Sequence, residues 1–314
     1  MRSAPGWRRF LTLLFYALLA AFLVYYLRGV DWRALARLEV RPLYLLAALP
    51  ISLGARFPQP LAWSWLLRAY GERPPPYPQL TLVYAKGWIG RYIPGSVAVL
   101  AGRVLFGSQY GVRPGVLAVT SVAEAGIQMI TSLATAFLLF AVAGQLEVLG
   151  PGLRLFAVVA FLIMSAALAP PVFNALVAWT HRVVLKRLPS QDTYRVALRP
   201  FLRVAALYAV LNVVSALPLF LLLKAVYDPL SLAHFSYLTA SFLLAGTLST
   251  LAVFAPTGIG VREGILIVLI SAVIPREVTV LAVVLLRLWT IAVDFAFYGL
   301  AALWERSRPL RAVP

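Results

Sequence analysis

Long apolar runs, separated by short polar or proline-containing stretches, dominate the hydrophobic pattern of this chain. A helix of about 18 or more apolar residues crosses the roughly 30 Å hydrocarbon layer of a membrane. The runs therefore predict an all-α, polytopic membrane helix bundle of about seven to eight spans, forming one domain over residues 1–314. The predicted spans are 10–28, 43–68, 115–143, 153–178, 201–226, 234–254 and 278–304.

Two further apolar segments are interrupted by residues that end helices. Segment 80–107 is broken at Pro94-Gly95-Ser96, and segment 256–274 opens with Pro256-Thr257-Gly258. Irregular backbone at membrane depth leaves N–H and C=O groups unpaired, unless protein or a water-filled cavity covers them. The number of spans agrees with the predicted sides of the loops and termini if segment 80–107 enters and leaves the membrane on the cytoplasmic side. This predicts a re-entrant segment; full crossings are the alternative.

The two interrupted segments belong to units with the same order of elements. Units 80–143 and 236–303 each contain an apolar piece, a Pro-Gly break, a short helix, a turn and a long helix with charged residues. Three predicted spans separate the units, so they would enter the membrane from opposite faces. Inverted repeats with interrupted helices are typical of transporters; a chance similarity is the alternative.

Composition and charge agree with a membrane protein. The chain is 62% hydrophobic and 12% charged, whereas a soluble domain has about 25% charged residues. Its net charge is +17, and most of the arginines fit cytoplasmic loops that contact anionic lipid headgroups rather than nucleic acid. The basic stretch 179–203 is predicted to be cytoplasmic, and the balance of loop charges predicts both termini in the cytoplasm and a location in the cell membrane.

Arginines next to the two breaks are not explained by topology alone. Arg91 and Arg103 stand on either side of the first break, and Arg262 follows the second. A helix that restarts after a break offers free N–H groups to an anion, and a guanidinium matches phosphate bidentately. Ser96 would cap the restarted helix, and the glycines at 258 and 260 would allow close approach of a ligand. The alternative is a pair of proline kinks with arginines that reach the interface.

Carboxylates within the spans are the second group of candidates. Glu124 is about ten residues into a predicted span, at a depth where a charged group costs at least about 2.5 kcal/mol, so it should face the bundle interior. Arg287 and Asp294 share one face of the last span. We predict a Glu124–Arg287 ion pair, which either fixes the packing or contacts a headgroup or carries protons.

Several kinds of chemistry find no support in the sequence. Cysteine is absent, so no thiol nucleophile exists. His181 and His234 have no partner at ligand spacing, which argues against a metal site. The glycines after Pro256 do not match a dinucleotide-binding pattern, and we expect no cofactor.

The chain also resembles a known family over nearly its whole length. The stretches that carry the resemblance are DWRALARL, AWSWLLRAYG, GRYIPGSVAVLAGRVLFGSQYGV, FAPTGIGVREGILIVLI and LLRLWTIAVDFAFYGL. They are similar to the flippase-like family that includes the transmembrane module of lysylphosphatidylglycerol synthases, the multiple peptide resistance factors. The resemblance implies a domain that moves a modified or glycosylated phospholipid, or a polyprenyl lipid, between leaflets.

Two departures from that family limit what the resemblance implies. Glu124-Ala125 stands where members often have an acidic residue followed by arginine. The soluble aminoacyl-transferase domain of the synthases is missing, so we do not expect this chain alone to make an aminoacyl lipid, and the relative's substrate is not carried over.

Together these observations predict a lipid flippase or scramblase for an anionic phospholipid, a modified phospholipid or a lipid-linked glycan. A membrane-embedded glycosyl- or acyltransferase with Glu263 as its acid, and a non-catalytic partner of a lipid synthase, are the alternatives. The expected partners are membrane lipids, a lipid-modifying synthase and a second copy of the chain. The predicted substrate-binding residues are Arg91, Pro94, Gly95, Ser96, Arg103, Glu124, Gly258, Gly260, Arg262, Glu263, Arg287 and Asp294.

Overall fold

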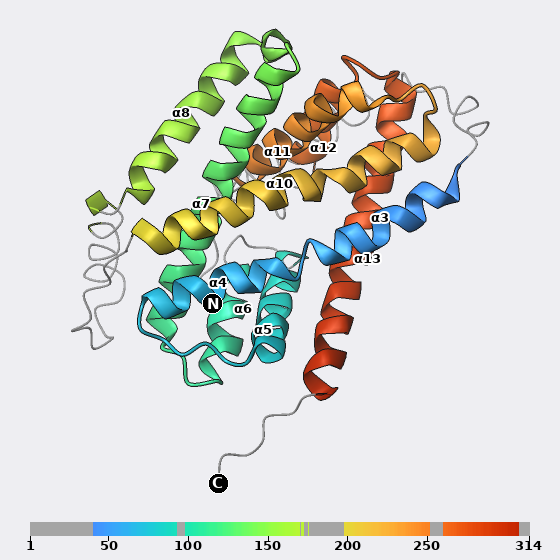
Figure 1. Cartoon of the computed structure of the whole chain (residues 1–314). Coiled ribbons are helices and arrows are strands. Elements are labelled where there is room, and N and C mark those ends of the chain that lie inside the picture. Colours follow the sequence, from blue (N-terminus) through green and yellow to red (C-terminus); the bar gives the residue numbers. More distant parts are fainter. Residues whose placement is uncertain are drawn as a thin grey trace, which may run out of the picture.

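The described part of the protein is helical throughout (Figure 1). The computed structural model describes residues 40–92, 98–169, 171–172, 175, 198–251 and 260–307. The predicted first span, both chain ends and four candidate residues of the breaks (Pro94, Gly95, Ser96 and Gly258) lie outside this part. The α-helices are α3 (Pro42–Gly54), α4 (Pro58–Ala69), α5 (Tyr77–Ile89), α6 (Ala98–Ser108), α7 (Pro114–Val142), α8 (Pro151–Leu168), α10 (Leu198–Val226), α11 (Phe235–Leu251), α12 (Val261–Ile270) and α13 (Arg276–Ser307); the short 3-10 helices are η1 (Gly90–Tyr92), η2 (Leu146–Val148) and η3 (Leu232–His234).

Three of the predicted spans coincide with the longest helices. Within the described residues, α7, α10 and α13 are long and apolar enough to cross a membrane. They correspond to the predicted spans 115–143, 201–226 and 278–304. Helix α11 lies within the predicted span 234–254, and α8 covers the described beginning of the predicted span 153–178. The all-α class is thus confirmed for the described residues.

The predicted span 43–68 is not one continuous helix. It divides into α3 and α4, with a turn at residues 55–57. Pro58 and Pro60 explain the interruption, because proline lacks an N–H group and fits the first turn of a new helix better than the interior of an old one. The turn brings Arg56 into the protein interior at the point where the chain changes direction.

Helices α5 and α6, which precede and follow the first break in the sequence, pack against each other as an antiparallel pair, which we call the α5–α6 hairpin. A Cβ atom added to Gly102 would lie 2.9 Å from the Cα of Gly87, so the two backbones touch where the helices cross. Just after the end of α5, the same addition to Gly90 would meet the carbonyl oxygen of Ala98 at 2.8 Å. With 13 and 11 residues, the two helices are about 20 Å and 17 Å long, each shorter than a full crossing.

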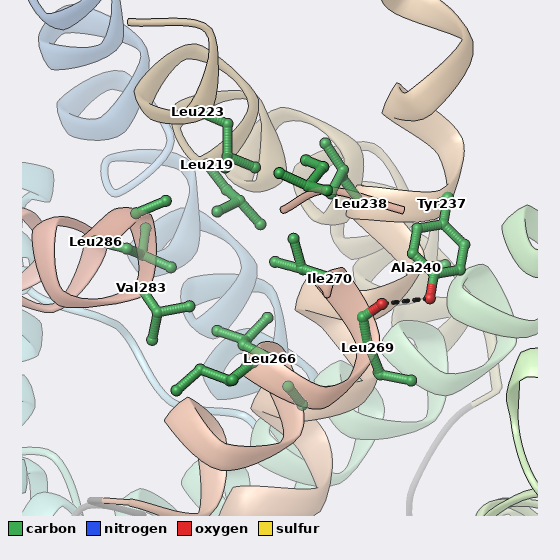
Figure 2. Close-up of a cluster of buried hydrophobic side chains, with 14 of the residues drawn as sticks. Leu219, Leu223, Tyr237, Leu238, Ala240, Leu266, Leu269, Ile270, Val283 and Leu286 are labelled. Carbon is green, nitrogen blue, oxygen red and sulfur yellow. Dashed lines mark hydrogen bonds between the residues drawn. The ribbon is translucent and has the colours of Figure 1, made fainter. Parts of the chain in front are cut away.

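Helices α11 and α12, which precede and follow the second break in the sequence, form a second antiparallel pair, the α11–α12 hairpin. The hydroxyl of Tyr237, near the start of α11, donates a hydrogen bond to the carbonyl oxygen of Leu269, near the end of α12, at 2.6 Å (Figure 2). Leucine, isoleucine and valine side chains from α10, α12 and α13 pack around this pair, including Leu223, Ile270 and Leu286. This apolar core fixes α12 against α13.

Helices α7 and α13 each pack against both hairpins. Helix α7 contacts α6 and also α11, whereas α13 contacts α12 and also α5. Figure 1 shows that α7 and α13 run in opposite directions, with α10 crossing the bundle between them. The central part of α13 therefore lies beside residues that border both breaks.

Candidate functional site

Asp294, in the middle of α13, gathers three polar side chains from other elements. Its side chain has no exposed surface. Oδ1 accepts a hydrogen bond from Nη2 of Arg56 at 2.6 Å, and Oδ2 accepts one from the hydroxyl of Tyr92 at 2.7 Å. Nη1 of Arg91 lies 3.5 Å from Oδ2. The carboxylate thus joins α13 to the α3–α4 turn and to η1, directly before the first break.

Glu263 performs a similar role at the end of the second break. Its Oε2 accepts a hydrogen bond from the backbone N–H of Gly260 at 2.6 Å, which caps α12. Gly260 has a φ of +86°, a backbone conformation that glycine adopts readily and that residues with a Cβ atom disfavour. Oε1 of Glu263 lies 3.3 Å from Nη1 of Arg287, two turns before Asp294 on α13.

Arg262 completes the group but pairs with no carboxylate. Its guanidinium lies over the ring of Phe242 at 4.8 Å, and among the described residues it makes no ion pair. Its buried Nε has no hydrogen-bond partner in the described part of the chain. Arg262 directly precedes Glu263 in the first turn of α12, and the positive charges of Arg91, Arg287 and Arg56 reach it.

Two of these arginines contact the same indole ring. The guanidiniums of Arg56 and Arg91 lie 5.0 Å and 4.7 Å from the centre of the Trp88 ring. Each of these cation–π contacts attracts a guanidinium to the ring. The indole Nε1 of Trp88 is buried and has no acceptor among the residues that the structure describes.

The group has more positive than negative charge. We call it the arginine cluster, and it consists of Arg56, Arg91, Arg262 and Arg287 with the carboxylates of Asp294 and Glu263. The side chains of Arg56, Arg91 and Arg287 are 15%, 27% and 22% exposed, so the cluster is accessible from outside the protein. The two break segments, 93–97 and 252–259, contain no charged residue that would offset the surplus. Such a site attracts an anion, and guanidiniums favour phosphate or carboxylate groups.

A second, charge-balanced group lies about one helical turn earlier along α5, next to Tyr84. We call it the Glu124 cluster. Arg103 and Glu124 form an ion pair of 2.5 Å, and both side chains are almost fully buried. The hydroxyls of Tyr208 and Tyr84 donate hydrogen bonds to Oε1 of Glu124 at 2.5 Å and 3.2 Å. The Arg103 guanidinium also lies 3.9 Å from the centre of the Tyr84 ring.

The structure therefore corrects the predicted Glu124–Arg287 pair. Glu124 pairs with Arg103, and Arg287 pairs with Glu263. The physical reason is the crossing of α5 and α6 at their glycines, which brings Arg103 against α7.

The predicted site residues consequently divide into two groups. Six of them, Arg91, Gly260, Arg262, Glu263, Arg287 and Asp294, belong to one connected region, whereas Arg103 and Glu124 form their own cluster. Sequence reasoning missed Arg56, Tyr92 and Trp88. An arginine in the middle of the apolar run 43–68, two residues before a proline, was the signal for Arg56.

Comparison with known proteins places most of the chain in one family. The family model described as "Lysylphosphatidylglycerol synthase TM region" matches residues 10–297. Among curated proteins, no match was found.

Proposed function

Since the chain belongs to the family of the lysylphosphatidylglycerol synthase transmembrane region, and is thus a membrane protein linked to phospholipid modification or transport, we propose that it is a lipid flippase or scramblase. The arginine cluster would hold the anionic headgroup while the lipid passes between leaflets. The observation that carries this proposal is the surplus of guanidiniums between residues that border two separate helix breaks.

The arrangement of the helices supports the proposal. We propose that the hairpin α5–α6 with α7, and the hairpin α11–α12 with α13, are inverted units of one membrane domain, and that both hairpins are re-entrant. The reciprocal packing of α7 on α11 and of α13 on α5 is what such symmetry requires. In transporters built from inverted repeats, the substrate site lies where interrupted helices of the two units meet.

The surroundings of the cluster fit a substrate with a polar head and apolar chains. Phe295 follows Asp294 on α13 and is 51% exposed, and Tyr92 stacks on its ring at 5.7 Å. Leu288 follows Arg287 and is 60% exposed. Apolar surface for acyl chains therefore begins one residue away from the charged groups, so a headgroup in the cluster would leave its chains in the lipid phase.

Reconstitution tests this function directly. The full chain is placed in liposomes with a trace of an anionic phospholipid that carries a fluorophore on its acyl chain, and dithionite is added outside. We expect bleaching beyond the outer-leaflet fraction with the protein and none without it. Arg262→Gln should lower the rate at least about tenfold, because it removes one charge from the binding group.

Arg203→Gln is the matched control. Arg203 also lies over an aromatic ring, that of Trp65 at 4.2 Å, but it is exposed and belongs to neither cluster. The Arg203→Gln variant should transport lipid at the wild-type rate, and both Arg203→Gln and Arg262→Gln should elute as monodisperse proteins. Equal rates in wild type and Arg262→Gln would contradict the role of the arginine cluster.

A further inference from the structure

We propose that the arginine cluster selects a headgroup whose phosphate carries two negative charges, as in a lipid phosphomonoester, over phosphodiester and cationic headgroups. The inference rests on the proposed function, because it names the class of lipid held by the same site. It follows from three properties of the cluster: its charge, its unpaired donors and its occupied acceptors.

The charge of the cluster favours a dianion. Arg56, Arg91, Arg262 and Arg287 stand against only two carboxylates, so the cluster has an excess of two positive charges. Charge in a poorly solvated region is costly unless it is compensated. A phosphodiester brings one negative charge and leaves the cluster cationic. A phosphomonoester, whose second pKa is about 6, brings nearly two at neutral pH and brings the balance close to zero.

The hydrogen-bonding groups that remain in the cluster are donors. Nε of Arg262 and, beside the cluster, Nε1 of Trp88 are both buried, and neither has an acceptor among the described residues. A buried donor without a partner costs about 1–3 kcal/mol. A terminal phosphate offers three unesterified oxygens, one more than a phosphodiester, and so it provides more acceptors for such donors.

Each carboxylate oxygen of the cluster already accepts from, or faces, at least one donor of the protein. Oδ1 of Asp294 binds Arg56, and Oδ2 binds Tyr92 and faces Arg91. Both oxygens of Glu263 are likewise engaged, by Gly260 and by Arg287. An ammonium group would have to compete with these donors for the carboxylates and would be repelled by four guanidiniums. A lipid that carries a basic amino acid is therefore a poor substrate for this site.

Retention of lipids on the purified protein tests the inference. The full chain in detergent is mixed with equal amounts of phosphatidic acid, phosphatidylglycerol, phosphatidylethanolamine and lysylphosphatidylglycerol with identical acyl chains, and bound lipids are identified by native mass spectrometry. We expect phosphatidic acid to exceed phosphatidylglycerol by about tenfold or more. Arg262→Gln reduces the excess charge by one, so the ratio should fall toward one while phosphatidylglycerol is still retained.

The controls separate the inference from the proposed function. Arg203→Gln should keep the wild-type ratio, since its arginine is outside the cluster. Retention of phosphatidylglycerol at or above the level of phosphatidic acid, in a protein that moves phosphatidylglycerol between leaflets, would overturn the inference and leave the function standing. A protein that neither retains nor moves any anionic phospholipid would overturn both.

A second arm distinguishes a lipid from free phosphate as the source of the dianion. Inorganic phosphate in excess should leave phosphatidic acid bound, because buried acyl chains add about 0.8 kcal/mol per CH2 group to the affinity of the lipid. Complete displacement of phosphatidic acid by inorganic phosphate would overturn the lipid source of the dianion.

Discussion

The Glu124 cluster and the arginine cluster lie one helical turn apart along α5, where Tyr84 of the first stacks at 6.2 Å on Trp88, which contacts Arg56 and Arg91 of the second. Both combine guanidiniums with carboxylates, yet their charges differ. In the Glu124 cluster one guanidinium meets one carboxylate, and side-chain exposures are 6% and 1%. In the arginine cluster four guanidiniums meet two carboxylates, and most of the arginines reach the surface.

This difference indicates what each cluster does. A balanced and fully buried ion pair is costly to break but needs nothing from outside, so it fixes the packing of the helices that carry it. A partly exposed cluster with surplus charge remains incompletely compensated until an ion binds. The same residue types thus fix the packing around Tyr84 and, in our proposal, bind a headgroup one helical turn further along α5.

The largest effect is expected from breaking the balanced pair. Glu124→Leu leaves Arg103 buried without its partner, which should destabilise the protein by about 3–5 kcal/mol. The double variant Arg103→Met/Glu124→Leu removes both charges and should recover most of that loss. Thermal unfolding of the purified proteins in detergent measures both. A single variant as stable as the double one would show that the pair does not fix the packing.

The second largest effect is expected at the crossing that positions both clusters. Gly102→Ala places a methyl group 2.9 Å from the Cα of Gly87, so α5 and α6 must move apart, at about 1–3 kcal/mol. Because α5 carries Tyr84 and Trp88, both stability and lipid transport should decline. Gly299→Ala in α13 is the control, since nothing lies within 4 Å of its added Cβ. Equal unfolding midpoints for the two alanine variants would contradict the close contact.

A smaller effect on stability, with a clear effect on transport, is expected in the arginine cluster. Arg91 is 27% exposed and shares Asp294 with Arg56 and Tyr92, so Arg91→Gln should shift the unfolding free energy by no more than about 1 kcal/mol. Lipid translocation should nevertheless fall about tenfold, because one of the charges that hold the headgroup is lost. If transport and stability declined in parallel, as for Glu124→Leu, the contrast between the clusters would disappear.

Hydropathy predicts the positions of the long helices, but it does not predict which charged side chains form ion pairs with each other. The apolar runs of α7, α10 and α13 are each longer than a crossing requires, so their positions follow from length alone. The partner of Glu124 depends on how closely α5 and α6 approach, which is set by Gly87 and Gly102 from different helices. A sequence pattern within one helix does not contain this distance, and Arg287 therefore remained an equally good candidate.

The prediction that failed over 43–68 has a related cause. A proline within an apolar run either bends one helix or begins another, and hydropathy is the same in both cases. The chain contains both outcomes within ten residues, since Pro50 lies inside α3 whereas Pro58 begins α4. The turn between the helices is what brings Arg56 to Asp294.

The smallest loss of stability is expected when a solvent-exposed arginine–carboxylate pair is removed. This loss is the reference against which the effects of the two clusters are compared. Arg41 pairs with Asp228 in the turn after α10, and both side chains are exposed. The hydrogen bond from Arg41 lowers the pKa of Asp228, so the pair stabilises the protein above the unfolded-state pKa of about 4 and loses that contribution as the pH falls through the lowered value. Asp228→Asn should therefore reduce the unfolding midpoint slightly at pH 7, and the difference from wild type should vanish under strongly acidic conditions. A loss at pH 7 as large as that of Glu124→Leu would mean that pairing itself, rather than burial, makes an ion pair essential in this protein.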